Sequence, residues 1–154
     1  MSRDKSLKTG SALMLLAALA FIGYAFVFLL RNFTSGGFEL WVDTLNGITK
    51  KRLNRLNPAI VYYISHLHVA TAGFIAATGI AVSFLSWYGV RKGMMWAWIG
   101  AVFAPVVGLA VALPLHWFNL FSHDWVTHLG PIYLATVIFV AGAFIAFNGL
   151  RKKT

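Results

Sequence analysis

Histidine is the residue type through which this chain could do chemistry. The 154 residues contain five histidines and no cysteine. Together with the one carboxylate near them, the histidines occupy three short segments: His66, His68, His116, His123, Asp124 and His128. Neutral imidazoles and a carboxylate suit zinc or copper, and a pair of imidazoles suits haem. The absence of cysteine excludes disulfides and thiolate metal sites.

The two histidines of the first segment are expected to lie on different sides of their helix. His66 and His68 lie two residues apart, so on a helix they point in roughly opposite directions and should not bind one ion together. His68 shares its helical face with Ser65 and Thr71, which are mildly polar. We therefore predict that His68 faces other helices, while His66 faces lipid or headgroups.

A carboxylate accompanies a histidine in the last segment. Asp124 and His128 lie four residues apart and would meet on one face of a helix, a geometry in which a carboxylate orients an imidazole ring. His116, close to Pro114, would approach from the neighbouring helix. With His66 and His123 as substitutes, the predicted metal site consists of His68, His116, Asp124 and His128.

Other interpretations of the histidines stay open. Histidine tolerates the membrane interface, where it hydrogen-bonds to headgroups or backbone, and no motif with defined metal spacing such as H-E-x-x-H is present. We therefore expect no bound cofactor, with copper, zinc or haem as the alternative. A histidine cluster could also shift a conformation by titrating between about pH 5 and 8.

The elements that must hold these residues are membrane helices. Hydrophobic residues make up 59% and charged residues 11% of the chain, against roughly 25% charged residues in an ordinary soluble domain. Crossing about 30 Å of hydrocarbon takes about 20 apolar residues. Four stretches qualify: residues 11–30, 60–88, 94–116 and 128–150. The first is longer than a signal-peptide core of about 7–15 residues and no convincing cleavage site follows it, so we expect it to be retained.

This pattern predicts an all-α membrane protein. Its single domain, residues 1–154, would fold as an antiparallel bundle of four transmembrane helices, because short connections make consecutive helices neighbours in space.

Basic residues give the chain a net charge of +9. They lie beside the ends of the predicted spans, where they meet the lipid bilayer's headgroups, so we expect no nucleic-acid partner. With four spans, one face of the membrane receives eight of them: Arg3, Lys5, Lys8, Arg91, Lys92, Arg151, Lys152 and Lys153. The other face receives five: Arg31, Lys50, Lys51, Arg52 and Arg55. The positive-inside rule then places both termini in the cytoplasm and the histidines at the opposite face of the cytoplasmic membrane.

The connection between the first two spans is too long for a simple turn. Apolar residues recur at helical spacing at Phe38, Trp41, Leu45 and Ile48. Acidic residues come early in this segment and basic residues late, as a helix dipole favours. We predict an amphipathic interfacial helix over residues 38–55, with a disordered basic loop as the alternative.

Small residues recur at intervals of four in three of the spans. The second span carries Gly73, Ala77 and Ala81, the third carries Gly100, Ala104, Gly108 and Ala112, and the fourth carries Gly142 and Ala146. Because lipid is as apolar as leucine, membrane helices associate where such residues let their backbones approach closely. Pro105 and Pro114 also predict a kink in the third span.

A turn motif joins the second and third spans. Its sequence runs Gly89-Val-Arg91-Lys92-Gly93-Met-Met-Trp96-Ala97-Trp98. Glycine permits the sharp corner, the basic pair holds the turn at the cytoplasmic face, and the tryptophans seat the next helix. The motif resembles the G-x-R-[RK]-G-x-x-W-A-W stretch of uncharacterised small prokaryotic four-helix membrane proteins that are DoxX-like in layout. This resemblance covers residues 89–98 and the helix layout, and it implies fold and topology without an activity.

Familiar catalytic arrangements are missing from the sequence. It has no paired carboxylates, nucleophile elbow or phosphate loop, and no charged residue lies inside a predicted span. We therefore expect a non-catalytic accessory or structural subunit that packs against a larger membrane complex, for example a membrane oxidoreductase, or that self-associates. The alternatives are a metal- or haem-binding protein that uses the histidine cluster, and a small carrier or channel.

Overall fold

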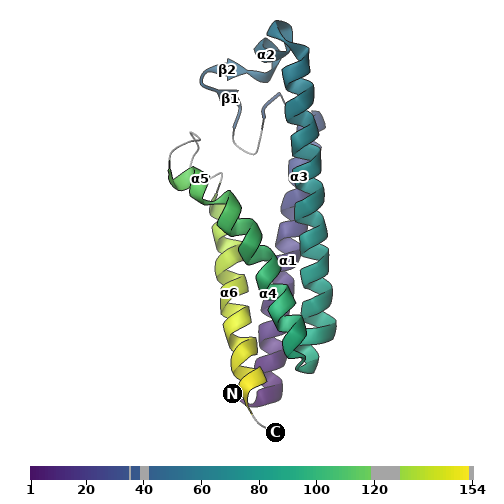
Figure 1. Ribbon diagram of the computed structural model, residues 1–154, viewed down its shortest axis with the longest axis vertical. Helices are drawn as coiled ribbons and strands as arrows, with labels where there is room; N and C mark the ends of the chain where they lie inside the picture. Colours follow the sequence, from purple (N-terminus) through teal and green to yellow (C-terminus); the bar gives the residue numbers. More distant parts are fainter. Residues whose placement is uncertain (35, 39–41, 119–128, 153–154) are drawn as a thin grey trace.

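Four long helices run up and down the computed structural model, which describes residues 1–34, 36–38, 42–118 and 129–152 without the side chains of residues 115 and 116 (Figure 1). Helix α1 spans Arg3–Thr34, α3 spans Pro58–Phe84, α4 spans Met95–Ala112 and α6 spans Gly130–Arg151. Both chain termini lie at one end of the bundle, together with the corner between α3 and α4, and the α1–α3 connection lies at the other. We call these the terminal end and the hairpin end.

Each of these four helices is long and apolar enough to cross a membrane. The expected all-α bundle of four membrane-spanning helices is therefore confirmed, and a lipid bilayer is the environment that such helices require. The third span is divided: α4 ends at Ala112, and a short helix α5, Pro114–Trp117, follows it. Proline has no N–H to donate and its ring clashes with the preceding turn, so Pro114 explains the division. Pro105 lies within α4 without ending it.

The connection at the hairpin end differs from the sequence-based prediction. Residues Thr44–Leu45 (β1) and Ile48–Thr49 (β2) pair as an antiparallel hairpin, and helix α2 covers only Lys50–Leu56. The helix predicted over residues 38–55 is therefore wrong for residue 38 and residues 42–49, and right for residues 50–55. Residues 39–41 lie outside the described part of the chain.

The hairpin forms because of its turn. Asn46 and Gly47 both have positive φ, 49° and 78°, which is the type I′ geometry that joins twisted strands through two residues. Leu45 lies opposite Ile48 in the hairpin register. The spacing that indicated one face of a helix thus arises from pairing across two short strands.

A sharp corner links α3 to α4 at the terminal end. Helix α3 continues as a π-helical turn, Leu85–Gly89 (η1), and a 3-10 turn, Val90–Lys92 (η2). Gly93 then adopts a φ of 79°, and its N–H donates to the Val90 carbonyl. Glycine enters this left-handed region without steric cost, which explains the second glycine of the turn motif.

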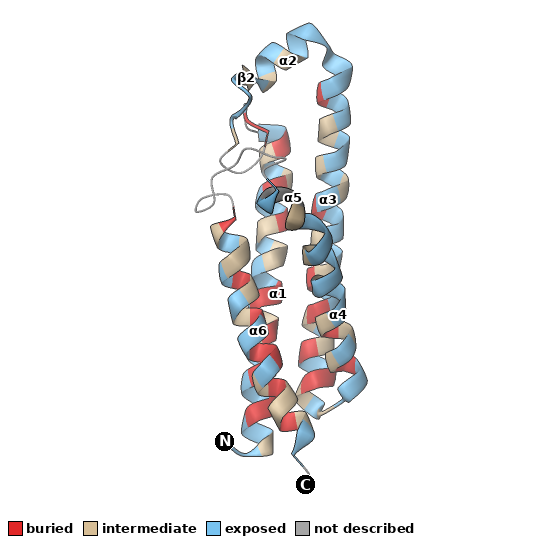
Figure 2. Ribbon diagram, turned by 60° about the vertical axis from the view of Figure 1, so that its left-hand side comes forward, coloured by how far each residue is buried: buried red, intermediate tan, exposed pale blue. Residues whose placement is uncertain are grey.

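The core is built on α1, which packs most extensively against α6 and α3. Figure 2 shows the buried residues of α1 and α6 facing one another toward the terminal end. A Cβ added at Gly10 would lie 2.7 Å from Ala146 Cα, and one added at Gly142 would lie 2.9 Å from the Gly10 carbonyl oxygen. These glycines bring the two backbones into contact, so the close packing predicted for the Gly142–Ala146 stripe is confirmed.

Trp98 connects two helices that otherwise touch little, α4 and α6. Its indole Nε1 donates to the Ala143 carbonyl over 2.9 Å, and its ring lies 4.9 Å from that of Phe147, measured between centroids. The last tryptophan of the turn motif therefore seats α4 against α6 by a directed hydrogen bond.

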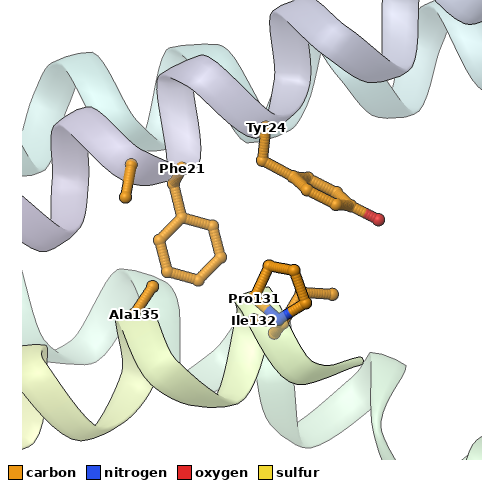
Figure 3. A pocket seen from close by; sticks show the side chains of 6 residues that line it. Phe21, Tyr24, Pro131, Ile132 and Ala135 are labelled. Atoms are coloured by element: carbon orange, nitrogen blue, oxygen red, sulfur yellow. The ribbon is translucent and has the colours of Figure 1, made fainter. Parts of the chain in front are cut away.

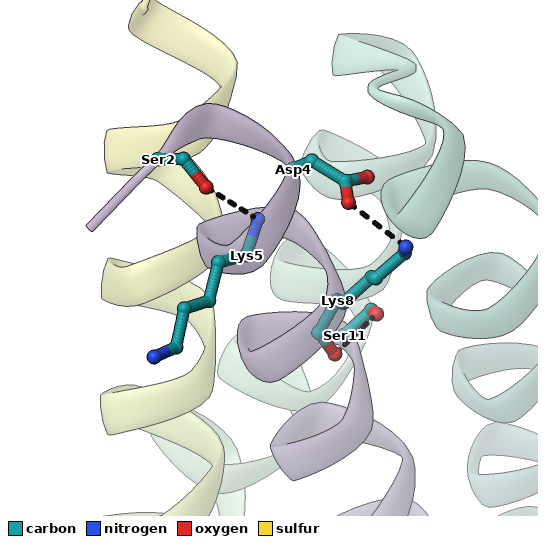
Figure 4. Close-up of polar contacts among 5 residues, drawn as sticks. All are labelled: Ser2, Asp4, Lys5, Lys8 and Ser11. Carbon is teal, nitrogen blue, oxygen red and sulfur yellow. Dashed lines mark hydrogen bonds and ion pairs between the residues drawn. The ribbon is translucent and has the colours of Figure 1, made fainter.

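Polar contacts at the start of α1 are local (Figure 4). The Lys5 N–H donates to Ser2 Oγ over 3.4 Å, Lys8 Nζ lies 2.8 Å from Asp4 Oδ2, and Ser11 Oγ donates to the Lys8 carbonyl. The side chains of Lys5 and Lys8 stay exposed. This arrangement leaves basic groups at the terminal end, where a membrane helix meets headgroups.

Candidate functional site

The described residues that could take part in chemistry lie at the hairpin end, where α1 meets α3. Phe28 on α1 contacts His68 on α3, with ring centroids 5.0 Å apart and a tilt of 59° between the rings. His68 is half-buried, whereas His66 is exposed. The structure therefore agrees with the spacing argument that His68 faces a neighbouring helix and His66 faces outward.

One turn beyond this ring contact, Asn32 lies buried between the same helices, with an exposed fraction of 5%. Its Nδ2 donates to Ser65 Oγ over 2.7 Å. Its Oδ1 has no hydrogen-bond partner within the described part of the chain. We call Phe28, Asn32, Ser65 and His68 the boundary cluster, because it joins α1 to α3 where the apolar run of α1 ends.

Two contacts tie the hairpin and α2 to the end of α1. Lys50 Nζ donates to the Asn32 carbonyl over 2.9 Å. This carbonyl belongs to the last turn of α1, whose acceptors have no partner within the helix, so the lysine caps it. Arg31 Nη2 lies 3.5 Å from Asp43 Oδ1, whose side chain is 79% exposed. An ion pair this exposed contributes only about 0–1 kcal/mol.

The predicted metal site lies only partly within the described residues. His116 belongs to α5, toward the hairpin end like His66 and His68, but its side chain is outside the description. His123, Asp124 and His128 lie outside the described residues altogether. Among the residues that are described, no group of three or more His, Asp or Glu could hold a metal ion. The four-residue site therefore stays a prediction.

A small groove of about 70 Å³ lies between α1 and α6 (Figure 3). It is lined by Ala20, Phe21, Tyr24, Pro131, Ile132 and Ala135. In Figure 3, Phe21 and Tyr24 of α1 face Pro131 and Ile132 of α6. Apart from the Tyr24 hydroxyl the lining side chains are apolar, so the groove suits a hydrocarbon chain and supplies neither an acid–base pair nor a metal ligand set.

The outward faces of α3 and α4 carry small residues that the bundle leaves uncovered. All of the following are exposed: Gly73, Ala77 and Ala81 on α3, and Ala104, Gly108 and Ala112 on α4. We call these six residues the small-residue stripes. A Cβ added at Gly73 or Gly108 would meet no described atom within 4 Å. In the most apolar 18-residue stretch of α4, 11% of residues are buried, against 28% in α1 and α6.

Comparisons with known proteins give no match. No family model, curated protein or solved structure matches this chain. The resemblance to DoxX-like proteins therefore stays a prediction that rests on the turn motif, and function has to be argued from the geometry above.

Sequence reasoning missed Asn32, which it assigned to the connection after the first span. The helix instead continues to Thr34. The available signal was the spacing of Asn32 four residues after Phe28, which places both on one helical face. Its partner Ser65 was expected on the inward face of α3 together with His68, and the structure places both there.

Proposed function

We propose that this chain is a non-catalytic integral membrane protein that serves as an accessory or structural subunit. It packs through the small-residue stripes against the helices of a larger membrane complex, for example a membrane oxidoreductase. The observation that carries this proposal is the exposure of both stripes, on helices whose other glycines, Gly79 and Gly100, are buried or half-buried.

The internal glycines show what such residues do in this chain. A Cβ added at Gly79 would lie 2.7 Å from Ile22 Cγ1, so this glycine lets α3 approach α1. Gly73 and Gly108 have no such role, although glycine destabilises a helix by about 1 kcal/mol relative to alanine. Close helix association in a membrane requires small residues, because van der Waals packing and hydrogen bonds drive it. Partner helices that pack on the stripes would give these two glycines the same use.

Leucine substitutions at the stripes test the proposal. We expect the wild-type chain, extracted in mild detergent, to migrate in native gels with a larger complex. Gly73→Leu and Gly108→Leu should each release most of it to the size of the free chain, because a leucine holds the helices apart. Gly23→Leu is the matched control: Gly23 is also exposed and open, but Leu19 and Val27 flank it at intervals of four. A wild-type chain that migrates alone, or three variants that behave alike, would contradict the proposal.

A second function, binding of a metal or haem, is favoured by one observation. His66, His68 and the helix that carries His116 all lie toward the hairpin end. We expect a metal-binding chain, purified without a tag, to contain near-stoichiometric copper, zinc or haem by elemental analysis and visible absorbance. Substitution of His116 or His128 by alanine should then remove it. Metal content unchanged in both variants would exclude the histidine cluster, whatever the result at the stripes.

A further inference from the structure

Helix α2 presents three basic side chains that the fold does not use. Four of its seven residues are basic: Lys50, Lys51, Arg52 and Arg55. Lys50 is held by the Asn32 carbonyl. The side chains of the other three are exposed and make no hydrogen bond or ion pair with any described residue. Three positive charges are therefore available to an anionic partner.

The boundary cluster fixes the level of α2 relative to the bilayer. The apolar run of α1 between Lys8 and Arg31 has 22 residues, 9 to 30, which rise about 33 Å at about 1.5 Å each and match a hydrocarbon layer about 30 Å thick. The hydrogen bond from Asn32 to Ser65 places Ser65 at the same boundary. From there α3 rises about 10 Å to Pro58, and α2 directly precedes it.

This level puts α2 at the outer edge of the headgroups. The headgroup zone adds about 5–8 Å on each side of the hydrocarbon. Lysine and arginine side chains extend along apolar surface to place their charge in a polar layer, so they reach back to the phosphates. Large side chains nearby are exposed: Leu56 at 68%, Tyr62 at 72% and Tyr63 at 64%. Tyrosines of this kind are typical of the membrane interface.

We propose that α2 and the start of α3 form a binding surface for anionic phospholipid headgroups in the leaflet at the hairpin end. Lys51, Arg52 and Arg55 bind the phosphate and other anionic oxygens, while Tyr62 and Tyr63, closer to the hydrocarbon boundary, contact the glycerol region. An acidic polypeptide would meet the same charges, but the exposed tyrosines Tyr62 and Tyr63 at headgroup depth favour a lipid.

A fluorophore on α2 tests the proposal directly. The chain has no cysteine, so Asn54→Cys on α2 accepts a single environment-sensitive label. The labelled full-length chain in neutral detergent is titrated with dihexanoyl phosphatidylglycerol and, separately, dihexanoyl phosphatidylcholine. We expect a saturable response to the first lipid, weakened by salt, and at least tenfold weaker binding of the second.

Removal of basic side chains shows whether the lipid binds at α2. Each basic residue near an anionic membrane surface contributes about 1 kcal/mol, or about fivefold in affinity. The triple variant K51Q/R52Q/R55Q should therefore bind phosphatidylglycerol about a hundredfold more weakly. The matched variant K5Q/K92Q/K152Q removes three charges at the terminal end and should bind like the wild type. If the first variant loses helicity by circular dichroism, Arg52→Gln and Arg55→Gln singly should each weaken binding about fivefold.

Three results would overturn the proposal. One is an equal response to the zwitterionic lipid. Another is equal loss of affinity in the two triple variants. The third is an oligoglutamate peptide of about 20 residues that binds more tightly than phosphatidylglycerol, which would make α2 a docking surface for acidic protein. None of these results depends on the small-residue stripes.

Discussion

Asn32 joins α1 to two other helices, α3 and α2, through polar groups of its side chain and its backbone. Its amide donates to Ser65 at the point where α1 leaves the hydrocarbon, and its carbonyl receives Lys50. Hydrogen bonds between membrane helices contribute about 0.6 kcal/mol on average and up to about 1.7 kcal/mol. Asn32 therefore fixes how α1 is positioned along α3 and α2, and this role matters as much as its contribution to stability.

A double-mutant cycle should measure this hydrogen bond. We expect Asn32→Ala and Ser65→Ala to show a coupling free energy of about 0.5–1.5 kcal/mol, because each removes the same contact. The measurement is unfolding of the purified chain by sodium dodecyl sulfate in mixed micelles. Strictly additive effects of the two substitutions would mean that the bond contributes nothing to the folded bundle.

Gly47 is the residue on which the hairpin depends. Its φ of 78° is strained for any residue with a Cβ, and an alanine there costs about 1–2 kcal/mol. We expect Gly47→Ala to speed hydrogen exchange in β1 and β2 at least fivefold while the helices keep their protection. Gly36→Ala is the control, since Gly36 is equally open and its φ is not positive. Equal exchange in the two variants would rule out the turn as the cause.

At the scale of elements, the contact between α1 and α6 is the most extensive helix–helix contact among the described residues. Backbone meets backbone at Gly10 and Gly142, and a Cβ at Gly149 would lie 2.9 Å from Ser6 Cβ. A side chain added at Gly10 or Gly142 has no space to occupy, because backbone atoms are among the atoms that it would meet.

Gly142→Val should therefore destabilise the bundle by about 2 kcal/mol or more, as expected for overpacking of a tight interface. Gly23→Val should change stability by less than about 0.5 kcal/mol, apart from helix propensity, because its Cβ would face open space. Unfolding in mixed micelles compares the two. A loss at position 23 as large as that at position 142 would show that glycine itself, and not the α1–α6 contact, matters.

How much of this could be predicted from the sequence varies by element. The four helices follow from apolar length alone, since a membrane leaves few other solutions for such segments. The hairpin does not follow from apolar spacing, because Leu45 and Ile48 also satisfy a helical period; its local signal is the dipeptide Asn46-Gly47. Spacing identified runs of small residues on three spans, but it cannot say which of these runs face inward: Gly142 and Ala146 do, and the small-residue stripes of α3 and α4 do not. Of the predicted site, His68 could be placed, whereas the register that brings it to Phe28 depends on how α1 packs.

At the scale of the whole molecule, the chain is an uneven bundle. Helix α1 and the α3 helix with its two terminal turns have 32 and 35 residues, while α4 and α6 have 18 and 22. The longer pair carries the hairpin and α2 beyond the shorter pair, as Figure 1 shows. The two ends of the bundle are therefore chemically distinct.

The orientation of these two ends can be measured with single cysteines. We expect Lys92→Cys and Lys152→Cys to react only with reagents that reach the cytoplasm, and Asn54→Cys only with reagents applied outside, because eight basic residues stand against five. Labelling of positions 54 and 92 from one compartment would contradict the four-span arrangement. Reversal of all three would leave the fold intact and overturn the orientation.

The pairing of α1 with α6 has a consequence for biosynthesis. Gly10 and Ala146 are in contact but 136 residues apart in the chain, and ribosomes add about 5–20 residues per second. The surface of α1 that packs against α6 must therefore stay uncovered for on the order of ten seconds before that helix is made. During that interval an insertase or chaperone that holds newly made helices would find its binding surface on α1, and release would coincide with arrival of the last helix.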